Sequence, residues 1–121
     1  MPNRFVILHH RLGASEHWDL MLEKGDVLAT WQLLKDPTGP DPFPIPARRI
    51  GDHRTDYLIY EGPLSEGRGH VHRVDRGDLE LHTLAADMCA FSADGTILRG
   101  RFELRRQADD SWLLEPNGLP D

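Results

Sequence analysis

The sequence predicts an all-β protein, a small antiparallel β-barrel with short helical or irregular connections. Short runs rich in β-branched and aromatic residues recur along its 121 residues. Turn signals separate these runs at intervals of about 8–12 residues, which is typical of sandwiches and barrels. Several runs alternate apolar and polar residues, most clearly residues 97–105 (ILRGRFELR). Such alternation indicates strands that bury one face.

The first third of the chain reads as three strands joined by turns. Residues 4–10 (RFVILHH) predict the first strand, and residues 11–16, which include Gly13, the turn after it. Residues 17–23 (HWDLMLE) predict the second strand and residues 27–34 (VLATWQLL) the third. Between them, Lys24-Gly25-Asp26 is a hairpin signal. Leucine-rich content would also allow helices, but the short runs and flanking glycine favour strands.

The rest of the chain begins with a proline-rich segment. Residues 36–46 hold five prolines, which predict a surface loop because proline cannot donate to a strand ladder. Further strands are predicted at residues 47–51, 57–61, 70–74, 79–84, 88–92, 97–105 and 112–115. Residues 75–78 (DRGD) predict a turn. Residues 116–121 predict a frayed tail.

Composition and length bound the class of protein. We expect residues 1–121 to form a single domain and a monomer. The formal net charge of −6 argues against sequence-blind binding of duplexes by a basic surface. The single cysteine, Cys89, cannot form an internal disulfide and fits a reducing cytoplasm. No apolar run approaches the roughly 20 residues of a membrane span, so we expect a soluble cytoplasmic protein.

The triplet His17-Trp18-Asp19 is the strongest chemical signal. Side chains two apart on a strand share a face, so His17 and Asp19 would project side by side. An imidazole and a carboxylate, joined by a ligand from a neighbouring strand, are typical of Mn²⁺ or Zn²⁺ sites. The alternative is a surface hydrogen-bonded pair. His53 and Tyr57, in the polar segment DHRTDY, form a second site-like group.

A rival metal pair lies farther along the chain. His70 and His72 share a strand face, with Asp75 as the nearest third ligand. They would suit a cupin-like metalloenzyme acting on small molecules. The alternative is that both histidines lie on a solvated face.

Several motifs, in shared order, resemble those of the 3′-phosphoesterase domain of bacterial DNA ligase D, which also occurs as a stand-alone protein. The matching segments are residues 5–10 (FVILHH), 17–23 (HWDLMLE), Thr30-Trp31 with Lys35, 52–57 (DHRTDY), 61–67 (EGPLSEG), 75–77 (DRG), 98–104 (LRGRFEL) and 112–114 (WLL). Each motif alone is weak, but their order extends over about 110 residues.

This resemblance implies a β-barrel with a surface groove. It implies an enzyme that needs a divalent transition metal, most often Mn²⁺, with Zn²⁺ or Co²⁺ as alternatives. Such enzymes remove a terminal ribonucleoside from a nucleic-acid 3′ end and then the 3′-phosphate, in a DNA repair setting with ligase and polymerase partners. By position, the metal ligands would be His10, His17 and Asp19. His53 and Tyr57 would contact the scissile phosphate as catalytic residues.

The sequence departs from the family pattern at three points. The family has an arginine two residues after the aspartate, where this chain has Met21, and a glutamate where it has Gly51. The loop before His17 is one residue longer, which leaves His9 as an alternative ligand to His10. The substrate phosphate would then be bound by other arginines, Arg54 and Arg48 foremost, with Arg49 as a further candidate. A second interpretation is a barrel that binds metal or nucleic-acid ends without turnover.

Overall fold

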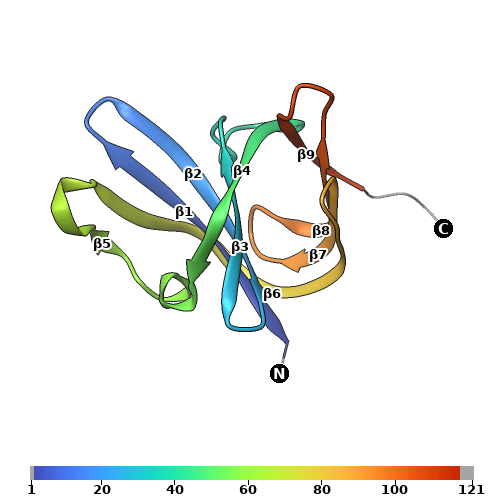
Figure 1. Cartoon of the computed structure of the whole chain (residues 1–121), viewed down its shortest axis with the longest axis horizontal. Helices are drawn as coiled ribbons and strands as arrows, with labels where there is room; N and C mark the ends of the chain where they lie inside the picture. Colours follow the sequence, from blue (N-terminus) through green and yellow to red (C-terminus); the bar gives the residue numbers. More distant parts are fainter. Residues whose placement is uncertain (1, 118–121) are drawn as a thin grey trace.

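The structure, a computed structural model, describes residues 2–117. Within this range it contains nine strands and two short 3-10 helices, in the chain order shown in Figure 1. Their bounds are β1 (Asn3–Leu12), β2 (Ser15–Lys24), β3 (Val27–Leu33), β4 (Ile45–Arg54), η1 (Thr55–Leu58), β5 (Gly62–Pro63), η2 (Ser65–Gly67), β6 (His70–Leu84), β7 (Met88–Asp94), β8 (Arg99–Arg106) and β9 (Trp112–Pro116).

The strands form one antiparallel sheet that closes on itself. Hydrogen bonding follows the order β1-β2-β3-β4-β9-β8-β7-β6-β5, and an additional pairing of β1 with β6 completes the ring. Closure removes most of the exposed strand edges that an open sheet would leave. The predicted all-β fold, an antiparallel barrel with short helical connections, is confirmed.

The barrel interior is filled by the alternating apolar residues of its strands. Phe5 and Ile7 of β1, Trp31 of β3 and Phe91 of β7 are all fully buried. The rings of Trp31 and Trp112 meet edge to face at 5.6 Å. Alternation therefore directs these side chains inward and leaves their neighbours for the outer face.

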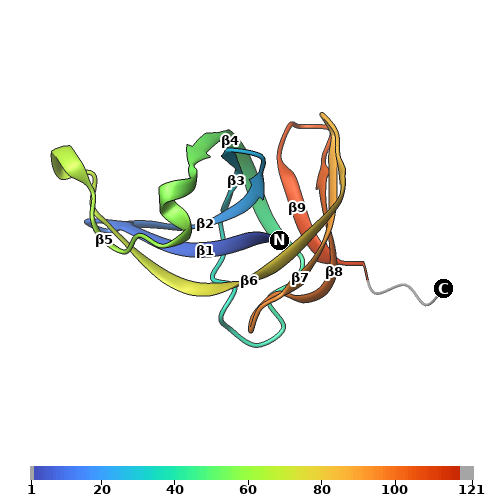
Figure 2. The same cartoon turned by 90° about the horizontal axis from the view of Figure 1, so that it is seen from below.

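A second apolar cluster lies outside the barrel wall. The residues 55–69, which include η1 and η2, fold across the outer face of β1 and β2, as Figure 2 shows for η1. We call this segment the cap. Leu58 of the cap is buried against apolar side chains of the wall. We call this group the outer cluster, and its members are Val6, Leu8, Met21, Leu28, Leu58 and Val71.

The strand predicted at residues 57–61 is wrong. Residues 55–58 form η1, and the backbone N–H groups of Ile59 and Tyr60 both donate to the carbonyl of Asp56. The apolar side chain that suggested a strand, Leu58, packs onto the outer cluster instead of pairing within a sheet. Burial against the wall therefore outweighs the local strand preference.

The turn predicted at residues 75–78 is also wrong, because β6 continues through it. The carboxylate of Asp75 accepts hydrogen bonds from the backbone N–H groups of residues 76, 96, 97 and 98, at 2.8–3.0 Å. A register shift in the β1–β6 pairing lies at this point. The residues that signalled a turn thus form an irregularity in a long strand and tie it to the β7–β8 hairpin.

Two further irregular segments are the proline-rich region and the end of the chain. Residues 34–44 carry no regular strand. The loop predicted at residues 36–46 is two residues too long, because β4 begins at Ile45 and Pro46 pairs with Leu113 of β9. Pro116 ends β9, and the N–H of Asn117 donates to the carbonyl of Arg101 at 2.8 Å. The rest of the predicted tail, residues 118–121, lies outside the described residues. Across residues 2–117, no helix has the length and apolarity to cross a bilayer.

Candidate metal centre

Strand register places two histidines and an aspartate on the outer face of the barrel. In the β1–β2 pairing, His10 lies opposite His17, and Leu8 lies opposite Asp19. Side chains opposite one another in an antiparallel pair project from the same face. Leu8 belongs to the outer cluster, so His10, His17 and Asp19 project on the side of the wall that the cap covers.

The three side chains converge closely. Nδ1 of His17 lies 2.7 Å from Oδ1 of Asp19, and Nδ1 of His10 lies 3.9 Å from Oδ2 of the same carboxylate. The two imidazole rings meet edge to face at 4.7 Å. One potential ligand atom from each residue lies within 4.8 Å of the others, the geometry of a group able to hold a metal ion.

The cap fixes the orientation of His10. Nε2 of His10 lies 2.7 Å from the backbone carbonyl of Arg68 and therefore donates its hydrogen there. Nδ1 of His10 then carries the lone pair, and this nitrogen faces Asp19. A backbone carbonyl that holds the second nitrogen is a common support for metal-binding histidines.

A glycine allows this approach of the cap to β1. Gly69 has a φ of +91°, and a Cβ atom built there would lie 2.0 Å from the carbonyl oxygen of Arg11. Only a residue without a side chain fits at that separation. Gly69 therefore permits the contact between Arg68 and His10.

His9, the alternative ligand, lies on the other face of β1. Its ring stacks on Trp18 with centroids 4.7 Å apart and planes 6° from parallel. Its Nε2 atom lies 2.7 Å from Oε1 of Glu16. The structure thus brings His10 and not His9 beside His17 and Asp19.

The donor set of this cluster fits a divalent transition metal. Two imidazole nitrogens and one carboxylate oxygen suit Zn²⁺, Mn²⁺ or Co²⁺ and leave coordination positions for other ligands. Asp19 is only 4% exposed, so its negative charge is poorly solvated without a cation or a protonated histidine beside it. His10, His17 and Asp19 are therefore the residues able to hold a metal.

His53 and Tyr57 lie together at the junction of β4 and η1. Nδ1 of His53 donates to the carbonyl of Gly51 at 3.0 Å, which leaves Nε2 as the nitrogen available to a ligand. The two rings meet edge to face at 5.7 Å. Tyr57 also packs against the outer cluster, the apolar layer beside Asp19.

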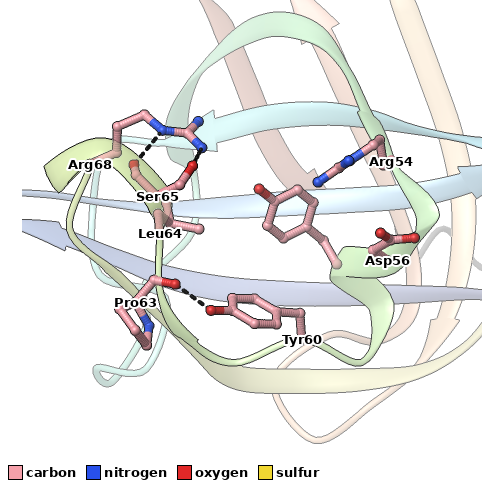
Figure 3. Close-up of a pocket in the computed structure, with 8 residues that line it drawn as sticks. Arg54, Asp56, Tyr60, Pro63, Leu64, Ser65 and Arg68 are labelled. Atoms are coloured by element: carbon pink, nitrogen blue, oxygen red, sulfur yellow. Dashed lines mark hydrogen bonds between the residues drawn. The ribbon is translucent and has the colours of Figure 1, made fainter.

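A cavity of about 310 Å³ opens beside Tyr57, between the two short helices of the cap. Figure 3 shows Arg54 and Arg68 on opposite sides of it, and Tyr60 and Pro63 along another edge. Its lining consists of Arg54, Asp56, Tyr57, Tyr60, Pro63, Leu64, Ser65 and Arg68. Arg68 connects the cavity to the metal-binding cluster, because its carbonyl accepts the hydrogen bond from His10.

Arg48 and Met21 are not among the residues that line this cavity. Arg48 donates two hydrogen bonds to Oε1 of Gln32, at 3.1 and 2.6 Å. The register places Gln32 between Arg48 and Asp19 across β3. Met21 is 1% exposed within the outer cluster, so the position of the family arginine is filled by an apolar side chain under the cap.

The rival histidines do not gather a third ligand in the described part of the chain. Nδ1 of His72 lies 3.0 Å from Oε2 of Glu61, but the His72 side chain is 74% exposed. The hydrogen bond from the backbone N–H of Arg73 lowers the pKa of Glu61, and the positive charges of Arg73 and His72 lower it further. Asp75, the expected third ligand, binds backbone N–H groups of the β7–β8 hairpin instead. His70 and His72 are both exposed, in agreement with the alternative that these histidines lie on a solvated face.

Sequence reasoning missed Arg68 and Ser65. Nε of Arg68 donates to the carbonyl of Ser65 at 3.0 Å, and Nη2 donates to its hydroxyl at 2.9 Å. The signal was present as the run Glu66-Gly67-Arg68-Gly69, in which glycines flank one arginine. Glycines around a charged residue favour a tight loop that presents that residue.

Comparisons with known proteins identify the family of this chain. Residues 8–106 match the family described as the DNA Ligase D 3′-phosphoesterase domain. A protein of Pseudomonas aeruginosa, named multifunctional non-homologous end joining protein LigD, is 30% identical over 110 residues. Proteins of Mycobacterium bovis and Mycobacterium tuberculosis, also named as multifunctional non-homologous end joining LigD proteins, are 28% identical over 118 residues.

The matched region spans most of this chain but little of those relatives. It covers 92% of the chain against the mycobacterial proteins and 81% against the Pseudomonas protein. It covers only 15% and 13% of their respective lengths. The family match spans more than half of the chain, so this protein belongs to the DNA ligase D 3′-phosphoesterase domain family.

Proposed function

We propose that this protein is a divalent-metal-dependent phosphoesterase that processes the 3′ ends of nucleic-acid strands during DNA repair. It would remove a terminal ribonucleoside and then the remaining 3′-phosphate. The convergence of His10, His17 and Asp19 within 4.8 Å, in a chain of this family, carries the proposal. The relatives' names place them in non-homologous end joining, which supports a role in joining broken DNA ends.

His10, His17 and Asp19 would hold the metal, and Mn²⁺ is the ion that we propose. A bound divalent cation would offset the negative charge of the phosphate and lower the pKa of a water molecule. Asp19 would contribute the anionic ligand and also orient His17 through their 2.7 Å contact.

His53 and Tyr57 would act on the scissile phosphate. The bond from Nδ1 of His53 to the carbonyl of Gly51 fixes the tautomer and leaves Nε2 available to the phosphate. A protonated Nε2 would stabilise negative charge on the phosphate or donate to the leaving oxygen. The Tyr57 hydroxyl would donate a hydrogen bond to a phosphate oxygen.

Arginine side chains would supply the remaining positive charge. Arg54 lines the cavity beside Tyr57 and is the stronger candidate for binding a substrate phosphate. Arg48 would assist from across β3 if it exchanged its bonds to Gln32 for a phosphate. At position 21 the apolar Met21 cannot provide a donor.

The direct test is hydrolysis of a defined 3′ end. Purified protein with Mn²⁺ is incubated with a DNA primer that ends in a 3′-phosphate, or in one ribonucleotide. We expect a 3′-hydroxyl product, and we expect Asp19→Ala and Asp19→Asn to reduce its formation by more than about 100-fold. His72→Ala serves as the control, since this exposed histidine lies outside the cluster. Folded wild-type protein that leaves both primers intact with Mn²⁺, Zn²⁺ and Co²⁺ would refute the proposal.

A second candidate function is binding without turnover. Met21 favours it, because a charge-assisted hydrogen bond to phosphate is worth roughly 1.5–3 kcal/mol and methionine offers none. A calorimetric titration with a 3′-phosphorylated strand separates the two cases. Binding with no product after long incubation favours the second function, and product formation excludes it.

The biological setting is the last part of the proposal. The matched region is a small fraction of the multifunctional relatives, so we propose that this domain works with ligase and polymerase activities in the cytoplasm. Its substrates would be the 3′ ends of DNA or RNA–DNA strands. Co-purification of a ligase or polymerase with the tagged protein would support that part, and its absence would count against it.

A further inference from the structure

The cavity between η1 and η2 carries a net positive lining on an acidic protein. The guanidinium groups of Arg54 and Arg68 outnumber the single carboxylate of Asp56 among its lining residues. The chain as a whole has a formal charge of −6. A concave site of opposite sign to the rest of the surface concentrates ligands of complementary charge, which here are anions.

Neither guanidinium is neutralised by a carboxylate within the described residues. Ion pairs engage Arg4, Arg73, Arg105 and Arg106, but not Arg54 or Arg68. Arg68 instead donates to the carbonyl and hydroxyl of Ser65. These bonds fix the side chain and leave other N–H groups of the guanidinium unused. A side chain that is already ordered loses less entropy when it binds a ligand.

Arg68 also joins the cavity to the candidate metal centre. Its carbonyl accepts the hydrogen bond from His10, and its side chain forms a wall of the cavity. The cavity and the candidate metal centre therefore adjoin through Arg68. A strand with its 3′ end at the metal could place a neighbouring phosphate in the cavity.

We propose that this cavity is a second phosphate subsite, in which Arg54 and Arg68 hold from opposite walls the phosphodiester upstream of the 3′ end. The inference rests on the proposed function and extends it to the path of the substrate strand. Arg68 then acts as a substrate-binding residue.

The test measures strand binding without turnover. A fluorescein-labelled ten-nucleotide DNA with a 3′-phosphate is titrated in EDTA at several salt concentrations and followed by anisotropy. We expect Arg68→Gln to weaken binding by about ten-fold and to reduce the slope of log affinity against log salt by about 0.7. We expect Arg54→Gln with Arg68→Gln to reduce that slope by about 1.4. Arg99→Gln, an exposed arginine on β8, is the matched control and should bind as wild type does.

A modified strand identifies the phosphate concerned. When the last internucleotide linkage is an uncharged methylphosphonate, wild type and Arg68→Gln should bind with equal affinity. An Arg68→Gln protein that matches Arg99→Gln on the unmodified strand would overturn the subsite. A loss of affinity in Arg68→Gln that persists on the methylphosphonate strand would also overturn the subsite. Both readings are independent of hydrolysis, so a failure of the phosphoesterase assay alone leaves the subsite standing.

Discussion

The two apolar clusters of this protein differ in what they hold in place. The interior cluster is formed by strands that all belong to the barrel, and its members, such as Trp31 and Phe91, are completely enclosed. The outer cluster joins the wall to the cap through Leu58, with Tyr57 at its margin. The interior therefore determines the fold, whereas the outer cluster positions the candidate site.

This difference predicts unequal responses to truncation. Phe91→Ala should lower the free energy of unfolding by about 3–5 kcal/mol, because it leaves a cavity that the closed barrel cannot collapse. Leu58→Ala should cost about 2 kcal/mol, since the cap can shift. Urea unfolding measures both values. Hydrogen exchange should rise across the whole barrel for the first variant and mainly in residues 55–69 for the second. If both variants lost the same free energy of unfolding and exchanged faster across the whole barrel, the cap would be part of the main folding unit.

Gly69 gives a sharper test of the attachment of the cap. Gly69→Ala should cost about 1–3 kcal/mol and displace Arg68 from His10, because its Cβ would meet the carbonyl of Arg11. Gly51→Ala is the matched control, since a Cβ there meets nothing within 4 Å. Thermal unfolding and Mn²⁺ affinity report the two effects. An unchanged Mn²⁺ affinity in Gly69→Ala would show that the carbonyl of Arg68 does not support the metal ligands.

The smallest expected effect is the alkaline response of the interior. Burial raises the pKa of the Cys89 thiol from 9.0 to about 12. Below pH 9 the thiol is neutral in both states, and between 9 and 12 it ionises only in the unfolded chain, which favours unfolding. The stability of wild type relative to Cys89→Ala should fall by about 1 kcal/mol between pH 9 and 10. A constant difference across this range would contradict burial of the thiol.

The sequence predicted the barrel better than the cap for a physical reason. Alternation in β8 indicates a strand with one buried face, and the continuous apolar runs of β1 and β2 indicate strands buried on both faces. Both patterns depend only on neighbouring residues. Residues 57–61 have the composition of a strand, but Leu58 is buried by contacts with residues distant in sequence. Local sequence patterns do not depend on contacts with distant residues, so they did not predict η1.

The candidate site shows the same limit. His17 and Asp19 were predicted to lie side by side, since that follows from strand periodicity alone. The choice between His9 and His10 required the register of β1 and the position of Trp18. Arg68 was missed because its contact with His10 spans 58 positions of the sequence.

The most direct test of the account is the stoichiometry of Mn²⁺ binding, measured by electron paramagnetic resonance of free Mn²⁺. The account predicts one site per chain in wild type and in His72→Ala, and loss of that site in His17→Ala and Asp19→Asn. Circular dichroism checks that each variant is folded. Retention of stoichiometric Mn²⁺ by folded Asp19→Asn, or its loss in His72→Ala, would place the metal elsewhere and contradict the account.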